Sequence, residues 1–345
     1  MKALVYTDTQ KSEIQDVELP VADEGQSVIE LEFCGICGSD MHAWHGHDER
    51  RIPPLVLGHE AVGLAASGPL VGKRVAINPL MTCGSCAVCN SGNEHLCATR
   101  ELIGMRVPGA FAEQVAINNK NLTEISDNLS SANAALAEPL ACAVNAVNQA
   151  ARHTGEKDAS IVVLGGGAIG LLAALVFSTY GYSNIQIAET NPLRRKLLER
   201  LGNFNPYDPL TTRPADASID IVLDAVGSGI TRQASSAMVC PGGVIVHIGL
   251  QDSKPGLDTR RITLQEISFF GVYCYRDSEF AKAISLLESG AISGRGWTEI
   301  RSLDEGARAF EDIHNGAAPP KIILQTNSLV GKKPHPNPFE ETVKW

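Results

Sequence analysis

The chain has 345 residues, of which 44% are hydrophobic and 20% charged, as in ordinary folded proteins rather than disordered ones. Its 29 basic and 39 acidic residues give a formal net charge of −10, which argues against binding to nucleic acid or to an anionic membrane, since both need concentrated Lys and Arg. The length favours two domains. No apolar run is long enough for a signal peptide or a membrane span, so we expect a cytoplasmic protein.

The first part of the chain, up to about residue 150, is predicted to form short β-strands separated by Gly and Pro. Residues 28–33 and 73–77 give the clearest strands. Between about residues 132 and 152, Ala, Leu and Val recur at helical spacing, and Gly155 follows as a stop signal.

From Ser160 the pattern changes to strand, glycine turn, helix, strand. A helix is predicted at 168–180, and buried strands at 161–164, 185–188, 219–223, 243–248 and 267–272. This alternation is typical of a doubly wound α/β sheet with parallel strands. After about residue 290 we expect mixed helix and strand that rejoin the first domain, and then an extended arm from Ser328 to Trp345.

A dinucleotide site is predicted at the first of these turns, where Gly165, Gly167 and Gly170 fit the pattern G-x-G-x-x-G. The pattern alone also fits a glycine turn that binds nothing, but here it follows a buried strand and begins a helix. Glu189 ends the second strand, where a carboxylate would hold the ribose 2′-hydroxyl of NAD and repel the 2′-phosphate of NADP. Arg194 and Arg195 complicate this, since a nearby Arg can accept that phosphate. We predict NAD rather than NADP.

Four cysteines, Cys83, Cys86, Cys89 and Cys97, lie within fifteen residues. Four thiolates form the closed tetrahedron that structural zinc prefers, with no position left for a substrate. Unrelated core cysteines or an iron–sulfur site are the alternatives. We predict a structural zinc that stabilises this loop.

Two further motifs are ordinary when taken alone. Cys34-Gly35-Ile36-Cys37-Gly38-Ser39-Asp40-Met41-His42 precedes Gly58-His59-Glu60 by about twenty residues, and Ala137-Glu138-Pro139-Leu140 follows the four-cysteine loop. Together with that loop and the dinucleotide motif, their order resembles the zinc-containing medium-chain alcohol and polyol dehydrogenases over essentially the whole chain. The branch with sorbitol, threonine and idonate dehydrogenases is more similar than the liver-type alcohol dehydrogenases.

This resemblance implies a catalytic zinc held by Cys37, His59 and Glu60, with Glu138 as a further ligand, directly or through water. A catalytic zinc keeps one position open, here for the substrate oxygen. Ser39 would take the proton of the alcohol, and His42 would pass it to solvent. A turn-capping role for Ser39 and a surface role for His42 are the alternatives, and His45 and His47 are expected to be solvated loop residues.

The resemblance also implies the fold and the cofactor contacts. We expect a GroES-like, mainly β catalytic domain (residues 1–150), a Rossmann domain (151–290) and a return segment (291–345), with the substrate between the two domains. A homodimer or homotetramer would form through the strand around residues 267–273. Besides the glycines and Glu189, the implied cofactor contacts are Ile169, Arg194, Ile248, Gly249, Leu250, Tyr273, Cys274 and Tyr275.

The sequence departs from sorbitol dehydrogenases at two places near the expected substrate pocket. Ala43 and Trp44 follow His42 where those enzymes have a tyrosine, and Cys274-Tyr275-Arg276 stands where they have an Arg-Tyr pair. The reaction type is unaffected, but the assignment to sorbitol is not supported. The remaining cysteines, Cys34, Cys142, Cys240 and Cys274, are expected to be buried free thiols.

We therefore predict NAD- and zinc-dependent oxidation of a secondary alcohol, a polyol or a sugar acid. A threonine-type dehydrogenase is the main rival. A zinc-free quinone or enoyl reductase is disfavoured, since such enzymes lack the Cys37/His59 pair and the four-cysteine loop. A catalytically silent binding protein is disfavoured because the metal ligands, hydroxyl relay and glycine turn are all present.

Overall fold

The computed structural model describes residues 1–153, 155–202 and 204–326, so the predicted arm from Ser328 to Trp345 lies outside the described residues. The chain divides into two compact units. Unit 1 contains Met1–Glu138 and the segment from Arg276 onward, and unit 2 contains Pro139–Tyr275. The units therefore divide after Glu138 and after Tyr275, whereas boundaries at residues 150 and 290 were expected. Most of the long helix α4 (Ala137–Ala151) is in unit 2 instead of unit 1, and residues 276–290 are in unit 1 instead of unit 2.

Unit 1 is built mainly of β-sheet. Its largest sheet has the order β10-β6-β5-β3-β18-β17, with β9 also paired to β3; the others are β2-β1-β4 and β7-β8. Its strands are β1 (Lys2–Asp8), β2 (Lys11–Asp16), β3 (Gln26–Gly35), β4 (Leu55–Val56), β5 (Glu60–Ala65), β6 (Arg74–Ile77), β7 (Leu80–Met81), β8 (Glu101–Leu102), β9 (Gln114–Asn118), β10 (Leu122–Glu124), β17 (Thr298–Ser302) and β18 (Lys321–Gln325).

The helices of unit 1 are short. They are α1 (Gly38–Trp44), α2 (Ala87–Asn90), α3 (Ser131–Ala134), α9 (Asp277–Glu288) and α10 (Gly306–His314), with 3-10 turns η1 (Glu94–Leu96), η2 (Asn119–Asn121) and η3 (Leu303–Glu305). The helix predicted for 132–152 is interrupted, because α3 ends before α4 begins at Ala137.

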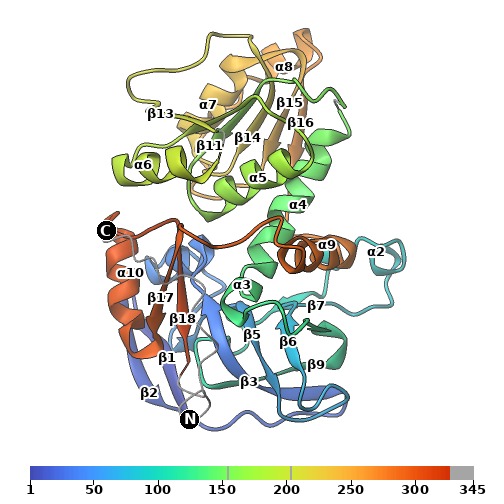
Figure 1. Cartoon of the computed structure of the whole chain (residues 1–345), viewed down its shortest axis with the longest axis vertical. Helices are drawn as coiled ribbons and strands as arrows, with labels where there is room; N and C mark the ends of the chain where they lie inside the picture. Colours follow the sequence, from blue (N-terminus) through green and yellow to red (C-terminus); the bar gives the residue numbers. More distant parts are fainter. Residues whose placement is uncertain (154, 203, 327–345) are drawn as a thin grey trace. The chain divides into compact units, whose positions relative to one another are not determined.

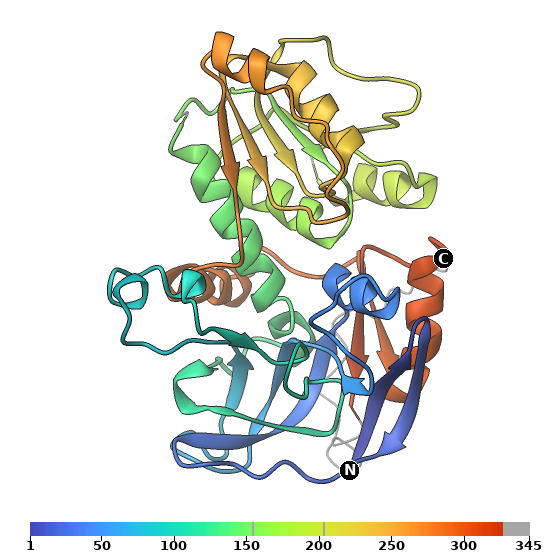
Figure 2. The same ribbon diagram turned by 180° about the vertical axis from the view of Figure 1, so that it is seen from behind.

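The end of the described chain completes the sheet of unit 1. Strand β18 pairs with β3, so that Ile323 lies opposite Gly35 and Gln325 opposite Phe33. Both views show the red C-terminal strands in the same part of the fold as the blue N-terminal strands (Figures 1 and 2). Strand β18 therefore belongs to the sheet of unit 1, although it lies far from β3 in the sequence.

Unit 2 is a doubly wound α/β fold, as expected. Its sheet has the order β13-β12-β11-β14-β15-β16, and every neighbouring pair is parallel. The central strand β11 is buried along its whole length because helices cover both faces (Figures 1 and 2). The elements are β11 (Ile161–Leu164), β12 (Ile185–Ala188), β13 (Asn205–Tyr207), β14 (Ile219–Asp224), β15 (Val239–His247), β16 (Ser268–Gly271), α5 (Ala168–Thr179), α6 (Pro192–Leu201), α7 (Gly229–Met238) and α8 (Thr259–Leu264).

Among the described residues, no helix combines the length and the apolar character needed to cross a bilayer.

Candidate active site

The structure brings together three of the predicted metal ligands in unit 1. One ligand atom each from Cys37, His59 and Glu60 lies within 4.8 Å of the other two. Cys37 precedes helix α1, whereas Glu60 begins strand β5 directly after His59. Glu60 lies opposite Gly35 at the end of β3, and a Cβ at Gly35 would come within 2.0 Å of the Glu60 carboxylate. A glycine is therefore needed there for Glu60 to reach this position.

Asp40 connects Cys37 and His59 from a fully buried position. Its Oδ2 accepts a hydrogen bond from the backbone N–H of Cys37 at 3.0 Å, and its Oδ1 lies 3.3 Å from Nδ1 of His59. A carboxylate beside Nδ1 favours the proton on that nitrogen, which leaves the Nε2 lone pair available for a metal. Asp40 therefore orients the predicted ligands on both sides of it.

Lys321 contributes a buried cation to the same site. Its Nζ lies 2.7 and 2.6 Å from the two carboxylate oxygens of Glu60 and 2.8 Å from the carbonyl oxygen of Ile36. Both side chains are almost inaccessible to solvent, at 1% and 0% exposure. A buried carboxylate needs such a partner, since an unpaired charge would be costly.

The acidic groups around the site stabilise the positively charged forms of His59 and Lys321. Burial alone would lower the pKa of His59, but Asp40 and Cys37 raise it well above its ordinary value. Burial would also lower the pKa of Lys321, but Glu60, Cys37 and Glu138 together raise it. Thiolate, imidazole and carboxylate donors in an anionic environment fit a zinc ion.

Glu138 lies near this group but is not one of its three members. It is buried in the first turn of α4, and its charge contributes to the raised pKa of Lys321. Its predicted role as a further ligand therefore stays a prediction.

The predicted proton-transfer residues are carried by α1. Ser39 Oγ lies 3.4 Å from Nε2 of His59, beside the predicted ligands. His42 is one turn further along the helix and half-buried. Burial and the charges of His47 and Arg51 lower its pKa, although Asp48 opposes them, so the imidazole is neutral near physiological pH. His45 is half-buried at the end of α1, where its Nε2 lies 2.9 Å from Nδ1 of His314 at the surface, and His47 is exposed.

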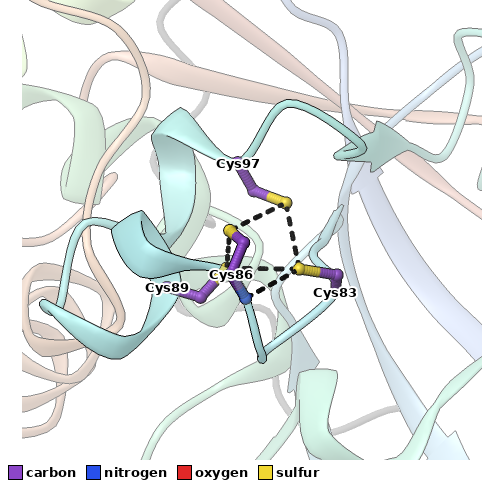
Figure 3. A group of neighbouring side chains, drawn as sticks. All are labelled: Cys83, Cys86, Cys89 and Cys97. Atoms are coloured by element: carbon purple, nitrogen blue, oxygen red, sulfur yellow. Dashed lines mark hydrogen bonds between the residues drawn. The ribbon is translucent and has the colours of Figure 1, made fainter.

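The four cysteines of the second predicted metal site converge on one point (Figure 3). Their sulfur–sulfur distances are 3.4 Å (Cys86–Cys89), 3.5 Å (Cys97–Cys83), 3.8 Å (Cys83–Cys89) and 3.9 Å (Cys86–Cys97). A tetrahedron with zinc–sulfur bonds of about 2.3 Å has edges of about 3.8 Å. The backbone N–H groups of Ser85 and Cys86 lower the pKa of Cys83 to about 5, which favours the thiolate that a metal requires, whereas burial and the neighbouring thiols raise the pKa of Cys89 to about 12, so its proton would leave on metal binding. The thiols therefore fit a closed zinc site.

The glycine turn of unit 2 has the conformation that its sequence requires. Gly165 has φ = +97°, and a Cβ at Gly170 would lie 1.9 Å from the carbonyl oxygen of Gly165. Gly167 precedes helix α5, and a Cβ there would point into open space. Packing within the protein does not require a glycine at residue 167, whereas a pyrophosphate close to the helix N-terminus would.

Glu189 is bound to this turn. Its carboxylate accepts hydrogen bonds from the backbone N–H of Gly166 at 2.9 Å and of Asn191 at 2.7 Å. The two arginines differ: Arg195 donates to the carbonyl oxygens of Glu189 and Thr190, each at 2.7 Å, and forms a 3.0 Å ion pair with Asp208. Arg194 is in helix α6, and its buried Nε has no hydrogen-bond partner among the described residues. Arg195 is therefore a structural residue.

The other predicted cofactor contacts, apart from Ile169, follow strands β15 and β16. Ile248 and Gly249 each donate a backbone hydrogen bond of 3.0 Å to the carbonyl oxygen of Asp224, which keeps this loop at the carboxyl end of the sheet. Leu250 is exposed and Tyr275 is buried. Ile169 lies in the first turn of α5, whereas Tyr273 and Cys274 follow β16. Of the four cysteines outside the two clusters, Cys34 is fully buried, whereas Cys142, Cys240 and Cys274 are partly accessible.

Three residues near the predicted ligands were not found from the sequence: Asp40, Arg51 and Lys321. Asp40 had a local signal, because an acidic residue three positions after Cys37 fits the start of a helix. Lys321 and Arg51 had none, since their partners are brought to them only by the fold.

Comparison with known proteins agrees with this geometry. Residues 23–127 match the alcohol dehydrogenase GroES-like domain, and residues 168–289 match the zinc-binding dehydrogenase domain. The chain is 31% identical to an L-threonine 3-dehydrogenase of Xanthomonas campestris, over 95% of this chain and 100% of that protein. It is 30% identical to a sorbitol dehydrogenase of Bacillus subtilis, over 90% and 93%. A Sinorhizobium meliloti protein solved with NADP bound is 26% identical, with a TM-score of 0.83, over 94% and 98%.

The chain therefore belongs to the zinc-binding medium-chain alcohol dehydrogenase family, with a GroES-like domain and a Rossmann domain. Within that family it is an oxidoreductase that acts on CH–OH donors.

Proposed function

We propose that this chain oxidises a secondary alcohol, a polyol or a sugar acid, by hydride transfer to NAD. The observation that carries the proposal is the convergence of Cys37, His59 and Glu60 beside the Ser39 hydroxyl. Cys37, Nε2 of His59 and Glu60 would hold the catalytic zinc, with Glu138 as a further ligand. The chemistry that zinc supplies when bound here is polarisation of the substrate oxygen, which lowers the pKa of the alcohol.

The residues of the chain then position the substrate oxygen and move its proton. Asp40 fixes the imidazole of His59, and the Ser39 hydroxyl accepts the proton of the alcohol while it passes its own toward His42. His42 is neutral near physiological pH and can receive that proton before it is released to solvent. The hydride leaves the carbon that bears this hydroxyl and goes to the nicotinamide, so one proton from oxygen and one hydride from carbon are removed for each ketone formed.

NAD is the proposed cofactor because Glu189 places a carboxylate at the end of β12, beside the glycine turn. Two backbone N–H groups hold it there. Its Oε1 accepts from Asn191 and, at 3.5 Å, from the Thr190 hydroxyl, whereas Oε2 accepts from Gly166 and keeps a lone pair for a ribose hydroxyl. A 2′-phosphate would meet like charge at this position.

L-Threonine is the second candidate substrate, because identity with the threonine dehydrogenase is as high as with the sorbitol dehydrogenase. We also propose a cytoplasmic homodimer or homotetramer joined through β16, which is the last strand of its sheet. Light scattering on the purified protein would measure the mass of the assembly.

The proposed function is tested by following NADH formation on polyols, sugar acids, L-threonine and simple alcohols, with and without a zinc chelator. We expect chelator-sensitive activity on a polyol or sugar acid, and its loss in C37S while NAD still binds. Activity confined to L-threonine would replace the first candidate by the second. Full activity in C37S would refute the zinc mechanism.

A further inference from the structure

Arg51 is a buried arginine in the loop between α1 and β4, and the proposed reaction does not yet use it. Its side chain is 1% exposed. Its Nε donates to the carbonyl oxygen of Gly104 at 2.8 Å, and its Nη1 donates to Asp48 Oδ2 at 2.6 Å. A buried guanidinium is tolerated only when it is neutralised and hydrogen-bonded in this way.

Both terminal nitrogens of the guanidinium also contact Ser39. Nη1 lies 3.3 Å from the carbonyl oxygen of Ser39, and Nη2 lies 3.4 Å from its Oγ. Arg51 therefore contacts both the backbone and the hydroxyl of the residue two positions after Cys37. That hydroxyl is also the group that lies 3.4 Å from Nε2 of His59.

Asp48 keeps Arg51 in this position. Its carboxylate bridges Arg51 and Arg50, with Arg50 Nε at 2.8 Å from Oδ1. Although burial opposes ionisation, the hydrogen bonds and charges of the two arginines lower the pKa of Asp48 to about 2. The Asp48 carboxylate of this bridge is therefore ionised at neutral pH.

The chemistry of a guanidinium determines which group donates the hydrogen bond between Arg51 and the Ser39 hydroxyl. A guanidinium has only donors, so Ser39 Oγ must accept from Arg51, and its own hydrogen must point elsewhere. A hydroxyl that accepts one hydrogen bond still has a second lone pair for the alcohol proton. It also keeps its own proton free to move onward.

We propose that Arg51 is a positioning residue for proton transfer, which holds Ser39 with a lone pair toward the substrate hydroxyl and its proton directed onward. This inference rests on the proposed function, because it assigns Arg51 a role only through Ser39. The positive charge of Arg51 also stabilises negative charge that develops on Ser39 Oγ as the proton leaves.

A double-mutant cycle separates this role from a merely structural one. The variants are R51M, which keeps the length of an apolar stem, S39A, and R51M/S39A, each compared with wild type for kcat/KM. We expect R51M to lower kcat/KM by roughly 10- to 100-fold and S39A by roughly 100-fold. In the S39A background, R51M should cost less than about 3-fold, because the hydroxyl through which it acts is gone.

A second readout does not depend on the rate alone. We expect R51M to increase the solvent deuterium isotope effect on kcat, since proton transfer becomes slower, while the zinc content and the affinity for NADH stay at wild-type values. R308Q is the control: Arg308 is 79% exposed, lies outside the Asp48 bridge, and should keep wild-type kinetics. If R51M loses zinc or unfolds, R51K takes its place in the same cycle.

Equal costs of the R51M substitution with and without Ser39 would overturn the proposal, as would an unchanged isotope effect. Wild-type activity in S39A would overturn both this proposal and the Ser39 relay. Chelator-sensitive NADH formation would then still support the proposed zinc- and NAD-dependent reaction, so the two failures are distinguishable.

Discussion

Glu189 shows how one side chain combines two tasks. Because its carboxylate accepts hydrogen bonds from Gly166 and Asn191, it supports the glycine turn as well as facing the proposed ribose site. The sequence predicted only the second task, because a pattern of glycines and one acid does not show where the turn finds its hydrogen-bond acceptor.

This leads to different expectations for two substitutions of Glu189. E189Q keeps one of the two acceptor oxygens and loses the charge, so the ratio of kcat/KM for NAD to that for NADP should fall about 10-fold or more, with a smaller loss of stability than in E189A. E189A should weaken both cofactors, since the turn loses its acceptors. Titration of each variant with both cofactors, followed by NADH or NADPH fluorescence, measures this. An unchanged ratio in E189Q would exclude Glu189 as the selective group.

His42 predicts the pH dependence of the reaction. Its pKa is lowered, so the imidazole stays neutral, and able to accept a proton, at pH values below the ordinary pKa of about 6.5. Alcohol oxidation should therefore be retained below pH 6.5 and be lost only as the pH falls through the lowered pKa. H42N should reduce kcat/KM and abolish this loss of activity at low pH. H47N should move the loss to higher pH, because the charge of His47 lowers the pKa of His42. The same loss of activity at low pH in wild type and H42N would contradict this role.

At the scale of elements, the four-cysteine loop is nearly independent of regular structure. Only α2 and η1 lie between Cys83 and Cys97, so the thiols and the metal they fit hold the loop together. C89S should lower the zinc content by one ion per chain and the thermal midpoint by roughly 5–10 °C, with kcat/KM per folded enzyme unchanged. Metal analysis and calorimetry measure both. A C89S protein with unchanged zinc content and midpoint would show that the loop holds no structural metal.

The strands of unit 2 were the most predictable elements. The runs at 161–164 and 185–188 match β11 and β12. Strand β11 is apolar throughout because it is buried on both faces, whereas β12 has the half-buried Gln186 within its apolar run. Strand β15 begins at Val239, earlier than the predicted residue 243, since its first residues include Pro241 and two glycines that do not read as strand. The division between α3 and α4 was also missed, because Ala and Leu continue the apolar pattern across the break.

Cys37, His59 and Glu60 could be proposed as ligands because their short motifs carry the family resemblance, whereas their buried supports could not be found in this way. Arg51 contacts Gly104, and Lys321 contacts Glu60, and neither pair leaves a pattern within any window of the sequence. Such partners become visible only when the topology is known.

At the scale of the whole molecule, the ion pair between Glu60 and Lys321 joins the beginning of β5 to the beginning of β18. K321M should lower the free energy of unfolding by about 3 kcal/mol, because it leaves a buried carboxylate unpaired. K321M/E60Q should recover part of this loss, since a neutral amide is less costly to bury. Urea unfolding of the apo-protein measures both variants, and equal losses in the single and double variants would show that the pair does not contribute through its charge.

The return of β18 to β3 also has a consequence for protein synthesis. Unit 2 is one continuous stretch, so all of its strands are translated before the last strands of unit 1. Unit 1 instead begins with the first residue and cannot complete its sheet, or neutralise Glu60, until Lys321 emerges. During translation, the N-terminal segment with its thiols therefore stays without a complete sheet until β18 has been made, whereas all the strands of unit 2 are available before that.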